Sequence, residues 1–374
     1  MTLKRSVAIL PLLLVALAVI VFAACGDDDG GDATETPGDG TDVPTVTDAP
    51  SGSHSQVLQN VLDRGRLNCG VNDAVPGIGV LLADGTFAGF DIDFCKAIAA
   101  AVLGDADLVD YTPLSSTARL PAVQTGQVDV LIRNTTWTTT RDAAEGLTYA
   151  TTTYYDGQGL MVRAADGFTS VDDLATAPIC VLEGTTTEVN LADRLPDAEQ
   201  VPFADNSLLQ QAFIDGRCDG WTSDKQQLAG RRSAFPADSG GPEALMIFAE
   251  TFSKEPLAPV TVDNDAQWSD IVNWVVIGTI AAEELGVTSA NVAAMAADPP
   301  NIGVARLLGV GFDGGEVTNT GLDVDVTFMQ DVLDQVGNYG EIYEANVTPI
   351  GIERAGTLNA LWTEGGLMYS PPFK

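Results

Sequence analysis

Short apolar segments alternate with amphipathic or alanine-rich segments along the chain from residue 66 onward. The apolar runs have the length and the residue types of buried strands, and the segments between them are typical of helices. We predict strands over residues 66–71, 108–111, 128–133, 179–182, 199–203 and 218–223. We predict helices over residues 94–103, 118–125, 189–194, 208–215, 268–285, 289–297 and 327–343.

The order strand-helix-strand-helix-strand therefore occurs twice. This order predicts two doubly wound α/β lobes with mainly parallel sheets. A body of about 320 residues that starts near Gln56 is also long for a single hydrophobic core. Ligands of such sheets bind at the carboxyl ends of strands, so we expect functional side chains directly after strands.

The N-terminus has a different pattern, in which Lys4 and Arg5 precede an apolar run over residues 7–22 and then Ala-Ala-Cys25. A basic head, an apolar segment of this length and small residues at its end predict a secretory signal peptide over residues 1–24. The cysteine after two alanines resembles a bacterial lipobox, in which Cys25 becomes the acylated first residue of the mature protein. The alternative is an uncleaved anchor helix, and in both cases the body lies outside the membrane.

Residues 26–55 contain eight acidic residues, no Lys or Arg and no aromatic residue. Such a segment buries too little apolar surface to offset the entropy of ordering, so we predict a disordered acidic tether over residues 25–55. The whole chain has a net charge of −34, which argues against nucleic acid as a partner.

The only histidine, His54, lies in this tether. The body therefore lacks the histidine that Ser-His-Asp catalysis, Cys-His catalysis or a His-ligated zinc site needs. No Gly-Lys-Ser/Thr phosphate-binding loop is present either. We expect no catalytic residues, no cofactor and no metal site.

Polar segments follow the predicted strands. The strand over residues 128–133 is followed by a hydroxyl-rich stretch with Asn134 and Thr136, and Arg141 then stands at the start of a helix. A cation there opposes the helix dipole, so it is not placed for helix stability. A guanidinium is a natural partner for a small carboxylate. The alternative is an ordinary solvated arginine.

The second repeat carries complementary chemistry. Its first strand is followed by Gly184-Thr185-Thr186, where hydroxyls and amides at a helix N-terminus can hold an anion. Its last strand ends at Asp224, which can accept an ammonium group. Ordinary helix caps are the alternative for both segments. Together, one arginine, one anion cradle and one aspartate match the two charges of a zwitterion.

The sequence resembles the solute-binding subunits of polar and general L-amino-acid ABC transporters, which have the type II periplasmic-binding-protein fold. The resemblance extends from about Val57 to Lys374, and its motifs appear in the family's order. These motifs are Gly89-Phe90-Asp91-Ile92-Asp93, Gln124-Thr125-Gly126-Gln127-Val128-Asp129, Arg133-Asn134-Thr135-Thr136-Trp137-Thr138, Thr153-Tyr154-Tyr155-Asp156-Gly157-Gln158-Gly159, Gly184-Thr185-Thr186, Gly216-Arg217-Cys218-Asp219, Asn338-Tyr339-Gly340-Glu341-Ile342-Tyr343, Leu358-Asn359-Ala360-Leu361-Trp362 and Gly365-Gly366-Leu367-Met368-Tyr369.

The resemblance implies a set of ligand-binding residues. Arg141 matches the arginine that binds the ligand α-carboxylate, with help from Thr136 in the motif that also contains Asn134. Thr185 and Thr186 match residues of the second lobe that bind the same carboxylate. Asp224 matches the acid that holds the α-ammonium group. The loop over residues 72–82 would line the side-chain pocket, with Ile78 where many members place a stacking aromatic residue.

The resemblance also implies the architecture and the function. Lobe 1 would comprise residues 56–154 and 259–374, lobe 2 would comprise residues 155–258, and two hinge strands would join them. The protein would be an extracytoplasmic monomer, attached to the membrane through Cys25, that captures free L-amino acids and delivers them to an ABC permease. The alternative is a periplasmic dehydratase of the same fold, with Glu183 or Lys254 as the acid or base.

Four cysteines remain in the body, and none is in a CxxC arrangement. An even number in an oxidising compartment predicts two disulfides, although four buried thiols are the alternative. Cys69 lies in the first predicted strand and Cys95 starts the helix that would cover it. Cys180 and Cys218 lie in strands that should be neighbours. We therefore expect the pairs Cys69–Cys95 and Cys180–Cys218.

Overall fold

The computed structural model describes residues 55–374. The predicted signal peptide, Cys25 and the tether up to residue 54 lie outside the described residues. Ser55, which we had assigned to the tether, belongs to the folded body. Its hydroxyl caps α1 (Gln56–Arg64) by accepting from the Leu58 amide, and it donates to Asp265 at 2.9 Å.

Lobe 1 is built on a five-stranded sheet with the order β5-β1-β6-β15-β7. Its strands are β1 (Leu67–Val71), β5 (Val109–Pro113), β6 (Val130–Leu131), β7 (Leu147–Tyr149) and β15 (Val260–Val262). β1 runs parallel to β5 and β6, whereas β15 is antiparallel to β6 and β7. The lobe also contains α2 (Phe90–Leu103), α3 (Arg119–Gln124), α4 (Thr139–Ala144), α8 (Ala266–Glu284), α9 (Val292–Ala297), α10 (Ile302–Leu307), α11 (Phe328–Gln335) and α12 (Tyr339–Asn346).

Lobe 2 has a second five-stranded sheet, with the order β11-β10-β12-β9-β13. Its strands are β9 (Gln158–Arg163), β10 (Pro178–Leu182), β11 (Glu199–Phe203), β12 (Gly220–Asp224) and β13 (Leu245–Ile247). Its helices are α5 (Thr186–Arg194), α6 (Asn206–Ile214) and α7 (Lys225–Ser233). β10 is parallel to β11 and β12, and β9 is antiparallel to β12 and β13.

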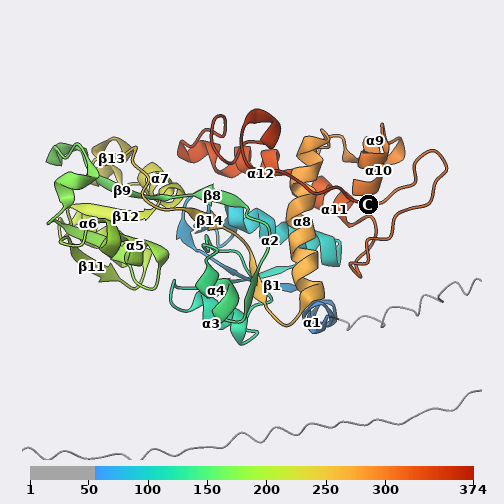
Figure 1. Ribbon diagram of the computed structural model, residues 1–374, viewed down its shortest axis with the longest axis horizontal. Helices are drawn as coiled ribbons and strands as arrows, with labels where there is room; N and C mark the ends of the chain where they lie inside the picture. The colour runs from blue at the N-terminus through green and yellow to red at the C-terminus, as the bar shows by residue number, and fades with distance from the viewer. Residues whose placement is uncertain (1–54) are drawn as a thin grey trace, which may run out of the picture. The chain divides into compact units, whose positions relative to one another are not determined.

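Two antiparallel strands connect the lobes, β8 (Tyr154–Asp156) and β14 (Glu255–Leu257). Figure 1 shows this pair between α5, α6 and β12 of lobe 2 and α2 and α8 of lobe 1. The predicted class, two doubly wound α/β lobes joined by two hinge strands, is confirmed.

The central strands of each sheet are buried on both faces, so each lobe has its own hydrophobic core. In β10, Ile179 and Val181 pack into one apolar cluster of lobe 2, while Cys180 and Leu182 pack into the other. Successive side chains of a strand point to opposite faces, so an unbroken apolar run is buried on both sides. In lobe 1, α2 and α8 share the largest cluster, where Trp268 is fully buried and its indole donates to the Asp129 carbonyl at 2.8 Å.

The structure divides one predicted helix and adds elements that the sequence patterns do not predict. The single helix predicted over residues 327–343 is divided into α11 and α12, because Gly337 adopts a φ of +100° and Asn338 starts a new helix. Asn338 and Glu341 form a capping box there, which favours a fresh helix start. A small three-stranded sheet that we had not predicted, β2 (Ala74–Val75), β3 (Gly79–Leu81) and β4 (Phe87–Ala88), follows β1.

Short 3₁₀ turns complete the described chain. They cover Ala164–Asp166, Val171–Leu174, Ala237–Ser239, Pro242–Ala244, Thr348–Ile350 and Trp362–Glu364. From residue 55 to the C-terminus, none of the helices combines the length and the apolar character needed to cross a membrane.

Both expected disulfides are present. Cys69–Cys95 ties β1 to α2, and Cys180–Cys218 ties β10 to the residues just before β12. All four sulfurs lie in fully buried residues, and each bridge stays within one lobe. The bridges therefore stiffen the lobes without restricting movement of one lobe against the other.

Replacing Cys180 and Cys218 together by alanine should lower the free energy of unfolding by roughly 2–4 kcal/mol, because the bridge restricts the unfolded chain. The same loss should follow for Cys69 and Cys95. Denaturant unfolding of the oxidised parent and of each double variant measures it. Non-reducing peptide mapping that finds a bridge between the lobes would contradict the pairing.

Candidate functional site

The carboxyl ends of β6, β10 and β12 face each other where the lobes meet, as expected for parallel strands. A narrow cavity of about 10 Å³ lies among the side chains that follow these strands. We call it the inner cavity. Its lining residues come from both lobes: Ser116, Arg119, Arg133, Asn134, Thr136, Leu182, Thr185, Thr186, Thr187, Ser223, Asp224 and Gln227.

Asn134 links the lobes at the centre of this site. Its side-chain amide donates to the Asp224 carboxylate at 2.9 Å and to the Gln227 side-chain oxygen at 3.2 Å. Its backbone adopts a φ of +32°, which is uncommon for a residue other than glycine. The Asp91 carboxylate holds this conformation by accepting a hydrogen bond from the Asn134 backbone N–H at 2.8 Å. An unusual backbone that its surroundings fix in this way is typical of binding sites.

Asp224 ends β12 and is buried. It occupies the cap position of α7, but its side chain caps no backbone amide. Burial, and then the nearby Glu255 carboxylate, raise the pKa of Asp224 above the usual aspartate value. The Asp224 carboxylate lines the inner cavity. In the described chain it accepts from the neutral Asn134 side chain, and no Lys or Arg side chain lies within hydrogen-bond distance of it.

Thr136 and Thr186 approach each other across the cleft. Their hydroxyl oxygens are 3.3 Å apart, and both donate to one oxygen of Glu255 at 2.7 Å. Glu255 belongs to the hinge strand β14 and also accepts from Asn190 at 2.9 Å. Sequence analysis missed Glu255, because an acid in a crossing strand has no local signature of a binding site.

Thr185 acts as the N-cap of α5. Its hydroxyl donates to the Leu182 carbonyl at 2.7 Å and accepts from the Glu188 amide at 3.1 Å. The helix-cap alternative therefore describes its side chain, although Thr185 still lines the inner cavity.

Arg141 lies in α4 and is buried, so the alternative of a solvated arginine does not hold. Its guanidinium donates to the Thr136 carbonyl at 3.0 Å. It is adjacent to the inner cavity through Thr136 but is not among the residues that line it.

Two further arginines, Arg119 and Arg133, line the inner cavity, and sequence analysis missed both. Arg119 donates to the carbonyls of Arg133 and Asn134 at 3.1 and 3.2 Å. Burial lowers the pKa of Arg119 well below its usual value, and the charges of Arg133 and Arg141 lower it further. Burial also lowers the pKa of Arg133, to about 10.

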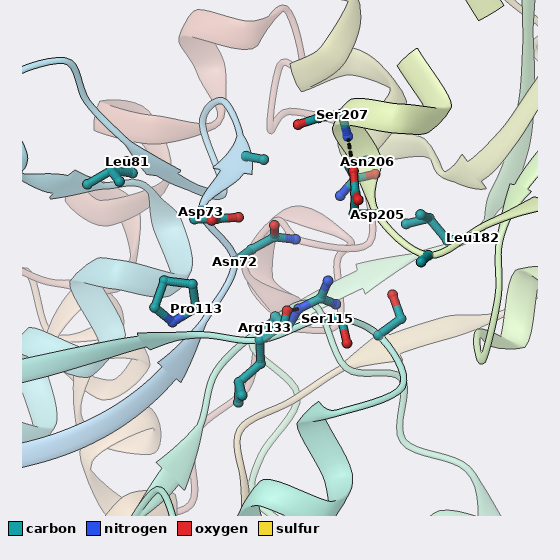
Figure 2. Close-up of a pocket in the computed structure, with 14 residues that line it drawn as sticks. Asn72, Asp73, Leu81, Pro113, Ser115, Arg133, Leu182, Asp205, Asn206 and Ser207 are labelled. Atoms are coloured by element: carbon teal, nitrogen blue, oxygen red, sulfur yellow. Dashed lines mark hydrogen bonds between the residues drawn. The ribbon is translucent and has the colours of Figure 1, made fainter. Parts of the chain in front are cut away.

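A wider cavity of about 550 Å³ opens beside the inner one, and the two share Ser116, Arg133 and Leu182. We call it the outer cavity. Figure 2 shows its labelled side chains coming from both lobes, with Asp205 accepting from the Ser207 amide at 2.9 Å. The loop over residues 72–82 contributes Asn72, Asp73, Ala74 and Leu81 to its lining. Ile78 contributes nothing to it, because this side chain is fully buried in the core of lobe 1.

The family model for bacterial extracellular solute-binding proteins, family 3, matches residues 67–346. The chain belongs to this family. The match spans both sheets and every residue that lines the two cavities.

Proteins similar to this chain are named as amino-acid-binding or periplasmic binding proteins. The glutamate/glutamine/aspartate/asparagine-binding protein of Rhodobacter capsulatus is 44% identical, with 86% of this chain and 94% of the relative covered. The general L-amino acid-binding periplasmic protein of Rhizobium johnstonii is 43% identical, with 87% and 94% covered. The structure of a periplasmic binding protein of an ABC transporter from Brucella ovis, with glutathione bound, has a TM-score of 0.81 at 40% identity. That likeness covers 86% of this chain and all of the other.

Asp91 allows a test of the buried electrostatics. Burial raises the pKa of Asp91 from 3.8 to about 7, against the opposing effects of the Asn134 amide and Arg133. The folded protein therefore holds a proton that the unfolded chain loses at lower pH. The resulting stabilisation is complete below about pH 4 and is lost as the pH rises through about 7.

The free energy of unfolding of the parent, relative to Asp91→Asn, should accordingly fall between pH 4 and pH 8, since the asparagine stays neutral and can still accept the Asn134 amide hydrogen. Denaturant unfolding of both proteins across this range measures the difference. A difference that does not change with pH would mean that Asp91 titrates normally.

Proposed function

We propose that this solute-binding protein captures free L-amino acids in the cleft between its lobes and delivers them, unchanged, to an ABC permease. One observation carries the proposal. A buried carboxylate of lobe 2, Asp224, and a group of buried arginines of lobe 1 converge on one polar cleft. A zwitterion carries the two charges that such a site can neutralise.

In the proposed complex, the ligand ammonium group binds Asp224 and the α-carboxylate binds Arg141. The second-lobe residues Thr185 and Thr186 contribute backbone amides at the start of α5, where the helix dipole favours an anion. Asn134 and Thr136 present polar groups from lobe 1. The ligand thus contacts both lobes, so it stabilises the closed arrangement over an open one.

The hinge gives this movement a physical basis. We place the boundaries of lobe 2 at residues 155 and 258, next to the strands β8 and β14 that connect the lobes. Because only two short strands cross, the lobes can rotate about them while each core stays intact. The closed surface would be what the permease recognises.

The relatives' names support the same function. Proteins named as binders of acidic amino acids and their amides, or of L-amino acids in general, match this chain over most of its length. We propose that binding proceeds without chemistry, by a monomer. The candidate acid and base of the dehydratase alternative, Glu183 and Lys254, line neither cavity.

A second candidate ligand is a small peptide with a free α-amino-acid end, such as glutathione. The outer cavity of about 550 Å³ is larger than a free amino acid needs, and it falls within the ~300–1,000 Å³ typical of sites for larger ligands. The Brucella ovis protein has glutathione bound. Including glutathione in the titrations described below separates the two candidates.

Removing Arg141 should weaken binding strongly, since a buried charge that loses its partner costs roughly 3–5 kcal/mol. We expect Arg141→Ala to reduce affinity by roughly two to four decades. Arg141→Lys should recover only part of it, because an ammonium group lacks the planar fork. Asp224→Asn should be similarly severe. Titration calorimetry of refolded, ligand-free protein against a panel of L-amino acids measures these effects.

Arg306→Ala, in α10 on the side of lobe 1 away from both cavities, is the matched control and should bind like the parent. All variants are first checked for folding by circular dichroism. If Arg141→Ala binds within about threefold of the parent, the carboxylate is held elsewhere.

We also propose that the mature protein begins at a diacylated Cys25 and attaches to the membrane, with the acidic residues after it as a tether. A Cys25→Ser variant should lose the lipid and move from the membrane fraction to the soluble fraction. Intact-mass spectrometry of the purified protein measures the modification. An unmodified Cys25, or an N-terminus at another residue, contradicts this assignment.

A further inference from the structure

Three buried arginines of lobe 1 meet at the cleft, and none has a carboxylate partner at ion-pair distance within residues 55–374. Arg119, Arg133 and Arg141 are only 3%, 4% and 8% exposed. In the described chain, these arginine side chains donate only to backbone carbonyls, those of Leu114, Arg133, Asn134 and Thr136. The ion pairs found between residues 55 and 374 all involve other cations.

Buried cations of this kind are costly unless an anion reaches them. A carbonyl satisfies one N–H group of a guanidinium but does not neutralise its charge. Burial lowers the pKa of Arg119, and the charges of Arg133 and Arg141 lower it further, while the nearby Asp224 carboxylate opposes this shift. The α-carboxylate of an amino acid supplies one negative charge, which we have assigned to Arg141. The Arg119 and Arg133 guanidinium groups are then still without a carboxylate at ion-pair distance.

Within residues 55–374, two buried polar atoms at the Arg119 and Arg133 guanidinium groups have no hydrogen-bond partner. The Ser116 hydroxyl and the Arg119 Nε are buried and have no hydrogen-bond partner in the described chain. Arg133 is fixed by its Nε, which donates to the Leu114 carbonyl at 2.6 Å, so its two terminal nitrogens remain for another acceptor. All three residues line the inner cavity, and Ser116 and Arg133 also line the outer one. An acceptor placed at this junction would satisfy all of them.

We propose that Arg119, Arg133 and Ser116 hold the side-chain carboxylate of an acidic L-amino acid, glutamate or aspartate, so that this site selects ligands with two carboxylates. The inference rests on the proposed function, because it takes the amino-acid backbone to be bound by Arg141 and Asp224. The junction lies between that clamp and the outer cavity, where a side chain leaving the α-carbon enters.

The chemistry of the junction favours a carboxylate over its neutral amide. A carboxylate accepts from several donors at once and pairs with a guanidinium fork. A glutamine side chain brings an NH₂ group; the Ser116 hydroxyl could accept from it, but the Arg119 and Arg133 guanidinium groups are donors only and would lose an acceptor. Such unpaired buried groups are what give polar sites their selectivity.

The outer cavity limits how far the negative charge can extend. Asp73 and Asp205 line it from opposite lobes. A further buried arginine, Arg231, lies near these two acids rather than at the inner cavity. A second carboxylate carried deep into the outer cavity would therefore meet both acids, whereas one held at the junction has Arg133 beside it, although Asp73 acts on Arg133 as well. This favours a short acidic side chain.

The test is the ratio of affinities for L-glutamate and L-glutamine, measured by titration calorimetry on refolded, ligand-free protein. We expect glutamate to bind about tenfold or more tightly than glutamine, because only glutamate neutralises the buried guanidinium groups. L-Aspartate, L-leucine and L-lysine complete the panel, and lysine should bind least. Arg133→Met should bring the glutamate-to-glutamine ratio to within about threefold, with the larger loss on glutamate.

Arg306→Met is the matched control and should keep the parental ratio, because Arg306 lines neither cavity. Ser116→Ala, a small change, should lower glutamate affinity more than glutamine affinity, and it keeps the test open if Arg133→Met does not fold. A merely structural role for Arg133 or Ser116 would weaken both ligands equally.

The outcomes separate this inference from the proposed function. If neither glutamate nor any other amino acid binds, the proposed function itself fails. If glutamine or leucine binds as tightly as glutamate, or if the ratio is the same in the parent, Arg133→Met and Ser116→Ala, amino-acid capture stands and the acidic-side-chain site is wrong.

Discussion

Asp224 of lobe 2 and Arg119, Arg133 and Arg141 of lobe 1 are buried where the lobes meet, and no ion pair within residues 55–374 joins these acids and bases. Buried charges that lack an ion-pair partner are unfavourable, and Asp224 acts on Arg119 and Arg133 without forming an ion pair with either. The surrounding structure nonetheless fixes these groups in place. The rest of the molecule can be understood as the support for this arrangement. An amino acid that supplies both charges relieves the cost on both lobes at once, which is why capture and lobe closure would be coupled.

The supporting structure separates rigid parts from one movable connection. The sheets are buried on both faces, and each disulfide closes within a single lobe. The hinge strands β8 and β14 pair over only three residues each. Glu255 in β14 accepts hydrogen bonds from Thr136 and from Thr186, so the hinge contacts both walls of the cleft directly. A ligand that contacts Thr136 and Thr186, as proposed, would therefore touch groups that are hydrogen-bonded to the hinge.

The sequence allowed the fold to be predicted because strand and helix periodicity are local properties. Asn134 and Asp224 could be proposed for the same reason, since ligands of such sheets bind at the carboxyl ends of strands. Arg119 was missed because an arginine at the start of a short helix looks like any surface residue until burial is known. Glu255 was missed because its partners are 119 and 69 residues away along the chain. The break between α11 and α12 depends on one glycine inside an otherwise helical pattern.

A crystal structure of the protein with its tightest-binding L-amino acid tests the central claim most directly. The account predicts one ligand between the lobes, with its ammonium group within hydrogen-bond distance of the Asp224 carboxylate and its α-carboxylate on the Arg141 guanidinium. A ligand that touches only one lobe, or a bound amino acid that leaves Asp224 without contact, would contradict it.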